Sequence, residues 1–129
     1  MINGGNATIF VSDMEQAINF YTKALGMKLR MRAENFWAEV EAGPGLIIGL
    51  HPASPNAEPP GTRGCVQIGL NVSEPLEKVR SRIAEHGVEF VGEIVADGPG
   101  RFANIKDPDG NPIYFWEPAV ECDGLAETG

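Results

Sequence analysis

The residues in this chain that could do chemistry are few, and His51 is the first of them. An imidazole titrates near neutral pH, so His51 could act as a general base or as a hydrogen-bonding group. A histidine at the end of a strand and just before Pro52 could equally be half-exposed and inert, and the sequence identifies no partner carboxylate. Both interpretations stay open, and His51 is the candidate catalytic residue.

Cysteine chemistry has less support. Cys65 and Cys122 are the only cysteines, and no CxxC spacing exists, which argues against a zinc ribbon or a thioredoxin-like site. Cys65 could be a nucleophile, but nothing nearby in the sequence would activate its thiol, so a small half-buried filler is favoured. Two lone cysteines fit a reducing cytoplasm, and residues 1–12 lack the basic and long apolar segments of a signal peptide. We therefore expect a cytoplasmic protein.

The charge balance argues against two classes of partner. The 10 basic and 18 acidic residues give a formal net charge of −8, whereas a nucleic-acid partner needs a basic surface. No apolar run approaches the roughly 20 residues of a membrane span. We expect neither a nucleic-acid nor a membrane partner, and the charge is compatible with a cationic ligand.

The chain divides into two halves with a similar order of predicted elements, and these elements position the candidate residues. Alternating apolar residues predict strands, and helical spacing between capping residues predicts one helix after the first strand of each half. In the first half the strands span 6–11, 27–32, 36–41 and 46–51, and Ser12-Asp13 caps a helix that ends at Gly26. In the second half the strands span 65–72, 89–96, 101–106 and 113–117, and Ser73 caps a helix that ends near Gly87. The repeated order is βαβββ.

The predicted organisation is one domain over residues 1–129, with modules at 5–51 and 64–118. Residues 52–63 contain four prolines without periodicity and form a linker, and 119–129 form a tail. Asp107-Pro108-Asp109-Gly110-Asn111 is a turn motif, because Pro108 suits its first central position and Asp109-Gly110 tolerate positive φ.

The period of two sorts the strand residues into two faces. One face is apolar and should pack under the helices: Ala7, Ile9, Val11, Leu46, Ile48, Leu50, Val66, Ile68, Leu70, Ile113 and Phe115. The opposite face holds the candidate ligand-binding residues: Asn6, Thr8, Trp37, Glu39, Gly49, His51, Gln67, Asn104, Tyr114 and Trp116. The aromatic rings offer flat surfaces to a planar ligand, and the amides and hydroxyl could orient it. The rings could also serve ordinary packing, including at a dimer interface, and Glu39 could attract a cation or be solvated.

Two motifs carry a resemblance to a known family. Residues 11–21 followed by Leu25-Gly26, and the turn at 107–111, resemble the opening and the last hairpin of the vicinal oxygen chelate superfamily, which includes glyoxalase I, bleomycin-resistance proteins and extradiol dioxygenases. The resemblance extends from about Asn6 to Glu117. It implies an α+β fold in which two βαβββ modules form an eight-stranded, U-shaped mixed sheet, with helices outside and a ligand cleft inside. It also implies a homodimer. The fold hosts isomerases, lyases, dioxygenases and drug-sequestering proteins, so it does not fix a function.

Metal-dependent members of that family hold a divalent cation at four positions, which the resemblance places at Asn6, Gly49, Gln67 and Tyr114. None of these is a histidine, carboxylate or cysteine, and an amide oxygen is a weak ligand for Zn²⁺, Ni²⁺ or Fe²⁺. A two-residue shift on the fourth strand would bring in His51, which is still only one good ligand. We therefore predict no metal and no other cofactor.

Two functions follow. The first is a metal-free protein that binds and sequesters a small aromatic or antibiotic-like compound. The alternative is a glyoxalase-like lyase or isomerase, or a dioxygenase-like enzyme, acting on a small molecule either through His51 as base or through a metal held by other ligands. Measuring the metal content of the purified protein would distinguish the metal-free binding protein from a metal-dependent enzyme.

Overall fold

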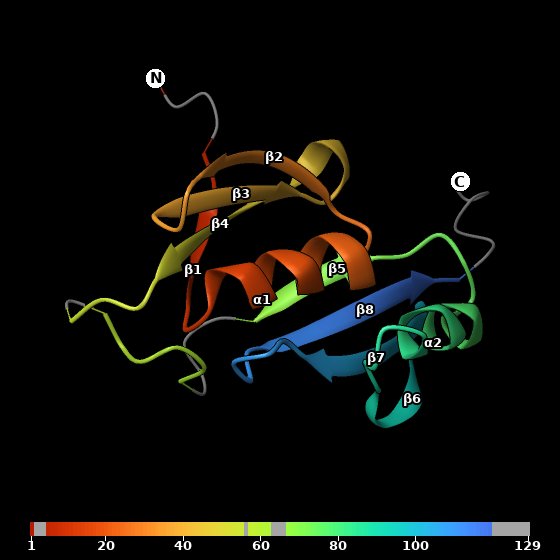
Figure 1. Cartoon of the computed structure of the whole chain (residues 1–129). Helices are drawn as coiled ribbons and strands as arrows, with labels where there is room; N and C mark the ends of the chain where they lie inside the picture. Colours follow the sequence, from red (N-terminus) through yellow and green to blue (C-terminus); the bar gives the residue numbers. More distant parts are fainter. Residues whose placement is uncertain (2–4, 56, 63–66, 120–129) are drawn as a thin grey trace. The chain divides into compact units, whose positions relative to one another are not determined.

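The computed structural model describes residues 1, 5–55, 57–62 and 67–119, and Figure 1 traces them. Over these residues the chain runs through the expected βαβββ order twice. It forms two compact units: Met1–Val66 with Asp107–Asn111, and Gln67–Lys106 with Pro112–Gly129. None of the described helices is long and apolar enough to cross a membrane.

The first unit is built on a four-stranded mixed sheet. Its strands are β1 (Ala7–Val11), β2 (Lys28–Ala33), β3 (Trp37–Glu41) and β4 (Ile47–Pro52), in the order β1-β4-β3-β2. β1 is parallel to β4, whereas β4 and β2 both pair antiparallel with β3. A parallel pair cannot be joined by a tight hairpin, so the helical segment and the β2–β3 hairpin lie between β1 and β4 in the chain.

The helix of the first unit begins as predicted. α1 (Met14–Asn19) has Asp13 as its N-cap, and the Asp13 carboxylate accepts a hydrogen bond of 3.0 Å from the Gln16 N–H. The expected α-helix then changes into a π-helical turn, Phe20–Ala24, in which the Leu25 N–H bonds to the Phe20 carbonyl at 3.1 Å. The extra residue shifts the helical periodicity. The chain leaves at Gly26, whose φ of 76° is in the left-handed region that glycine favours.

The second unit repeats this topology. Its strands are β5 (Ile68–Asn71), β6 (Val91–Asp97), β7 (Gly100–Lys106) and β8 (Pro112–Pro118), in the order β5-β8-β7-β6. β5 pairs parallel with β8, and the other two pairs are antiparallel. Strand ends within the described residues differ from the predictions by at most two residues, apart from the start of β5, where residues 65 and 66 lie outside the described residues.

The predicted cap of the second helix is wrong. α2 (Leu76–Ala84) begins after Pro75, which has an extended ψ of 142°, and no side chain at that position caps it. Ser73 is therefore too far from the first turn to act. Instead the Glu117 carboxylate of β8 accepts a 3.1 Å hydrogen bond from the Leu76 N–H. A residue 41 positions away supplies the acceptor that a local serine was expected to supply.

The predicted apolar face is largely confirmed. Eight of its members are less than 9% exposed: Ile9, Val11, Ile48, Leu50, Ile68, Leu70, Ile113 and Phe115. Ala7 is exposed because it opens the edge strand β1, and Leu46 is only half-buried because it lies in the turn ahead of β4. Val66 lies outside the described residues. Two of the other edge strands, β2 and β6, leave large apolar side chains exposed, among them Met31 and Val91.

Candidate functional site

In the first unit the predicted ligand face forms a continuous row across three strands. Thr8 on β1 and Glu39 on β3 are both in register with Gly49 on β4, and Phe10 is in register with His51. These side chains alternate with the buried ones, so they share the face opposite the core. Thr8, Glu39 and His51 are half-buried, and Asn6 is exposed.

Residue 49 has no room for a side chain, because the Trp37 ring covers its backbone. A Cβ at residue 49 would overlap the Trp37 indole and would lie 3.1 Å from the Asn6 amide oxygen. The indole N–H donates a 2.9 Å hydrogen bond to Glu39, which holds the ring in this orientation. The half-buried Trp37 ring therefore packs directly on the backbone of Gly49.

His51 lies beside two of these aromatic rings. Its ring centroid is 5.1 Å from that of Phe10, at an interplanar angle of 56°, and 6.3 Å from that of Trp37, at 70°. His51 Nδ1 is 2.7 Å from the Pro52 carbonyl. A carbonyl can only accept, so Nδ1 carries the hydrogen and Nε2 of the neutral imidazole holds the lone pair. No carboxylate among the described residues hydrogen-bonds to the ring.

The second unit has a corresponding face. Tyr114 on β8 is in register with Gly69 on β5 and with Asn104 on β7, and Trp116 is in register with Phe102. A Cβ on Gly69 would overlap the Tyr114 ring, so here too a glycine leaves room for an aromatic side chain. Gln67 is exposed and precedes β5. The structure thus brings together six predicted residues on one face of the first unit, and Asn104, Tyr114 and Trp116 on one face of the second.

The four positions to which the family resemblance assigns a metal are poorly suited to hold one. The Asn6 amide oxygen accepts a 3.0 Å hydrogen bond from the Thr8 hydroxyl. The space that a side chain at Gly49 would need is filled by the Trp37 ring, and Tyr114 lies against Gly69. Among the described residues no group of three or more His, Cys, Asp or Glu side chains is arranged to hold a metal ion. The donor set is therefore poor for a divalent transition metal.

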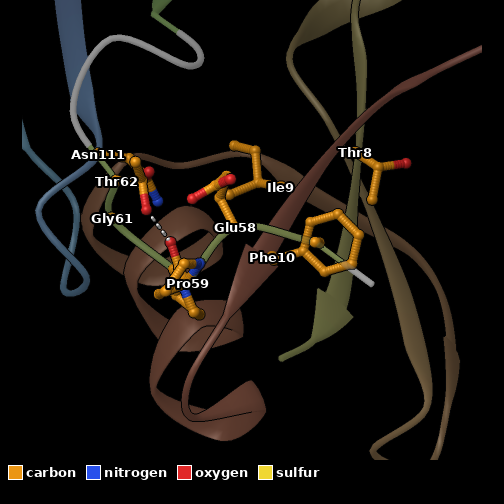
Figure 2. Close-up of a pocket in the computed structure, with 10 residues that line it drawn as sticks. Thr8, Ile9, Phe10, Glu58, Pro59, Gly61, Thr62 and Asn111 are labelled. Carbon is orange, nitrogen blue, oxygen red and sulfur yellow. Dashed lines mark hydrogen bonds between the residues drawn. The ribbon is translucent and has the colours of Figure 1, made fainter. Parts of the chain in front are cut away.

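The structure also contains a pocket that sequence analysis missed. It has a volume of about 220 Å³ and lies between the edge strand β1 and the loop 57–62 (Figure 2). Thr8, Ile9 and Phe10 line one side, and the loop and Asn111 line the other. The sequence feature that could have indicated the pocket is Pro59-Pro60-Gly61, because these residue types favour a rigid turn. Gly61 has a φ of +84°, and a Cβ there would overlap the Asp109 carbonyl, so the loop is packed directly against the turn at 107–111.

The turn at 107–111 has a structural role. Asp107 is 5% exposed, and its carboxylate accepts hydrogen bonds from the Tyr21 hydroxyl at 2.8 Å, from the Asn111 N–H at 2.7 Å and from the Asn111 side chain at 2.9 Å. Burial raises the pKa of the Tyr21 hydroxyl far above its usual range, and the neighbouring Asp107 charge raises it further. Tyr21 therefore stays protonated and donates to Asp107.

The topology of the two units defines the fold class of the protein. Two βαβββ units, each with a parallel pair formed by its first and last strand, make up the fold of the vicinal oxygen chelate proteins. The family model described as "Glyoxalase/Bleomycin resistance protein/Dioxygenase superfamily" matches residues 5–115. The chain belongs to that superfamily. No curated protein matches it by sequence.

Solved structures agree on the fold and differ in function. The chain is 26% identical to TnmS3, described as an antibiotic binding protein from Streptomyces sp. CB03234, with a TM-score of 0.73 over 92% of this chain and 99% of that one. It is 25% identical to a superfamily member from Sphaerobacter thermophilus DSM 20745, with a TM-score of 0.73 over 91% and 98%. A lactoylglutathione lyase from Agrobacterium tumefaciens is 14% identical, with a TM-score of 0.68 over 87% and 90%, which shows the fold alone.

Proposed function

We propose that this protein binds a small, partly aromatic molecule without the help of a metal and thereby sequesters it. The observation that carries the proposal is the pairing of Trp37 with Gly49, because an aromatic ring lies where a side chain at a metal position would project. In the second unit the aromatic residue itself, Tyr114, stands at one of these positions, and its ring lies against Gly69. The similarity to an antibiotic-binding protein over nearly the whole chain supports the same function.

The chemistry of the first unit's face suits such a ligand. Phe10, His51 and Trp37 present half-buried rings at steep angles to one another, so they can contact a planar molecule by its face and by its edge. Glu39 and Thr8 lie in the same row and can orient its polar groups. Apolar surface with a few polar groups is the usual composition of a small-molecule site.

A second candidate is a lyase or isomerase, and one observation favours it. The hydrogen bond to Pro52 leaves the His51 Nε2 lone pair available to accept a proton. In such a reaction Nε2 would take a proton from carbon next to a carbonyl, the electron pair would remain on the substrate as an enolate, and the proton would return at a different atom. His51→Asn should then abolish turnover while ligand binding persists.

The test is a thermal-shift screen of the purified protein against aromatic antibiotics, thiol conjugates and divalent metals, with and without a chelator. We expect at least one aromatic compound to raise Tm in a chelator-independent manner, because a ligand that binds only the folded state stabilises it by mass action. Stoichiometric nickel, zinc or iron in protein purified without added chelator would contradict the proposal.

Two glycine variants localise the effect. Gly49→Ala should abolish the ligand-induced shift, because the new methyl group displaces the Trp37 ring. Gly45→Ala is the matched control: the space around its Cβ is open and its φ is not in the left-handed region. If both variants retain the shift, the ligand does not bind at this face. We also propose, from the family resemblance and the cysteine content, a cytoplasmic homodimer.

A further inference from the structure

The pocket beside β1 lies within the first unit and differs from the aromatic face, although Thr8 and Phe10 border both. Most of its wall comes from the loop 57–62, which contributes Glu58, two adjacent prolines and Thr62 (Figure 2). The loop is anchored where Gly61 meets the Asp109 backbone. The pocket therefore has a defined shape, and its polar groups decide what it can bind.

Most hydrogen-bond donors in this wall are already engaged. The Thr62 hydroxyl donates to the Pro59 carbonyl at 2.6 Å, a bond drawn in Figure 2, and the Thr8 hydroxyl donates to Asn6 at 3.0 Å. A hydroxyl has one hydrogen, so each of these groups now offers only lone pairs. Asn111 gives its backbone N–H and one amide hydrogen to Asp107. Pro59 and Pro60 have no N–H to give.

Acceptors and negative charge remain available. Glu58 is exposed at the pocket, and no cationic side chain among the described residues forms an ion pair with it. The Phe10 ring lines the same pocket, and the face of an aromatic ring attracts a cation. An anionic ligand would find a negative charge and few donors. A single carboxylate also falls far short of the six to eight oxygen ligands that Ca²⁺ takes.

We propose that this pocket binds a small protonated amine, with its ammonium group at Glu58 and its apolar part against Phe10 and Pro59. The volume of about 220 Å³ lies below the range of about 300–1,000 Å³ that is usual for drug-sized ligands, so a one-ring amine fits better than a large antibiotic. The inference goes beyond the proposed function, because it assigns a second pocket and a different ligand class.

The experiment is an NMR titration of the ¹⁵N-labelled full chain with 2-phenylethylamine, which is protonated at pH 7. Phenylacetate and 2-phenylethanol serve as anionic and neutral probes of similar size. We expect the amine to shift the amide resonances of Gly61 and Thr62 in a saturable way. The alcohol should bind up to about fivefold more weakly, since an exposed ion pair is worth up to about 1 kcal/mol, and phenylacetate should not bind.

Charge-removing variants complete the test. Glu58→Gln should weaken amine binding about fivefold, whereas Glu89→Gln, which removes the same charge from an exposed position in the second unit, should not. Equal binding of amine and alcohol, or an unchanged affinity in Glu58→Gln, would overturn the inference. Gly49→Ala should leave amine binding intact, so failure of this inference can be distinguished from failure of the proposed function.

Discussion

In each unit a five-residue turn connects the last two strands. The two turns share a backbone hydrogen bond but differ in whether their side chains are buried. Residues 42–46 join β3 to β4, and the Ala42 N–H bonds to the Leu46 carbonyl at 2.9 Å. Residues 107–111 join β7 to β8, and the Asp107 N–H bonds to the Asn111 carbonyl at 3.0 Å. The backbone is closed in the same way over the same number of residues.

The side chains of the two turns differ completely. Gly43, Pro44 and Gly45 are exposed, whereas Asp107 and Asn111 are buried at 5% and 8% exposure. The Asp107 carboxylate accepts hydrogen bonds from both amide groups of Asn111 and from the Tyr21 hydroxyl, which lies 86 residues away in the chain. The most conspicuous polar motif in the sequence is therefore a structural anchor. The residues that we propose to contact ligands lie on the strands and on the loop 57–62.

The largest test of this comparison is Asp107→Ala. The substitution leaves the buried Tyr21 hydroxyl and the Asn111 amide without their acceptor, and each unsatisfied group costs about 1–3 kcal/mol. We expect the free energy of unfolding to fall by about 3–5 kcal/mol, measured by urea denaturation. In the matched turn, Pro44→Ala should change it by less than about 0.5 kcal/mol, because Pro44 is exposed. Equal effects would mean that Asp107 does not anchor its turn.

The starts of the two helices give a test of intermediate size. Asp13→Ala should lower the free energy of unfolding by about 1 kcal/mol, because the carboxylate caps the Gln16 N–H. Ser73→Ala should have no measurable effect, since Ser73 precedes the helix by too many residues to cap it. Both are measured by urea denaturation. A loss at Ser73 as large as that at Asp13 would contradict the assignment of Glu117 as the acceptor for α2.

The smallest effect concerns an exposed ion pair of the second unit. Hydrogen bonds from the Arg101 guanidinium, at 2.9 Å to each Glu77 oxygen, lower the pKa of that carboxyl from 4.5 to about 2. A carboxyl with a lowered pKa stabilises the folded state above pH 4.5, and this contribution is lost as the pH falls towards 2. Glu77→Gln should therefore be slightly less stable than the wild type at pH 6 and equally stable near pH 2, by urea midpoint. A difference independent of pH would contradict the ion pair.

Much of the fold could be predicted because its signals are local. Alternation along a strand places Ile9, Ile48 and Ile113 on the buried face, and each is less than 5% exposed. Asp13 and Gly26 mark the helical segment because a cap and a left-handed residue act on their immediate neighbours. The π-helical turn at Phe20–Ala24 was not predicted, since no local signal separates it from an α-helix of the same composition.

For the candidate site, the sequence by itself determined which residues alternate onto one face of each strand, and the family resemblance predicted that four of these positions carry poor metal ligands. Only the tertiary structure decided that Trp37 covers Gly49, that Glu117 takes the role expected of Ser73, and that the loop 57–62 encloses a pocket with β1. The physical reason is the sequence distance over which each interaction acts. Periodicity and caps act over a few residues, whereas Tyr21 meets Asp107 and Gly61 meets Asp109 only after the chain has folded.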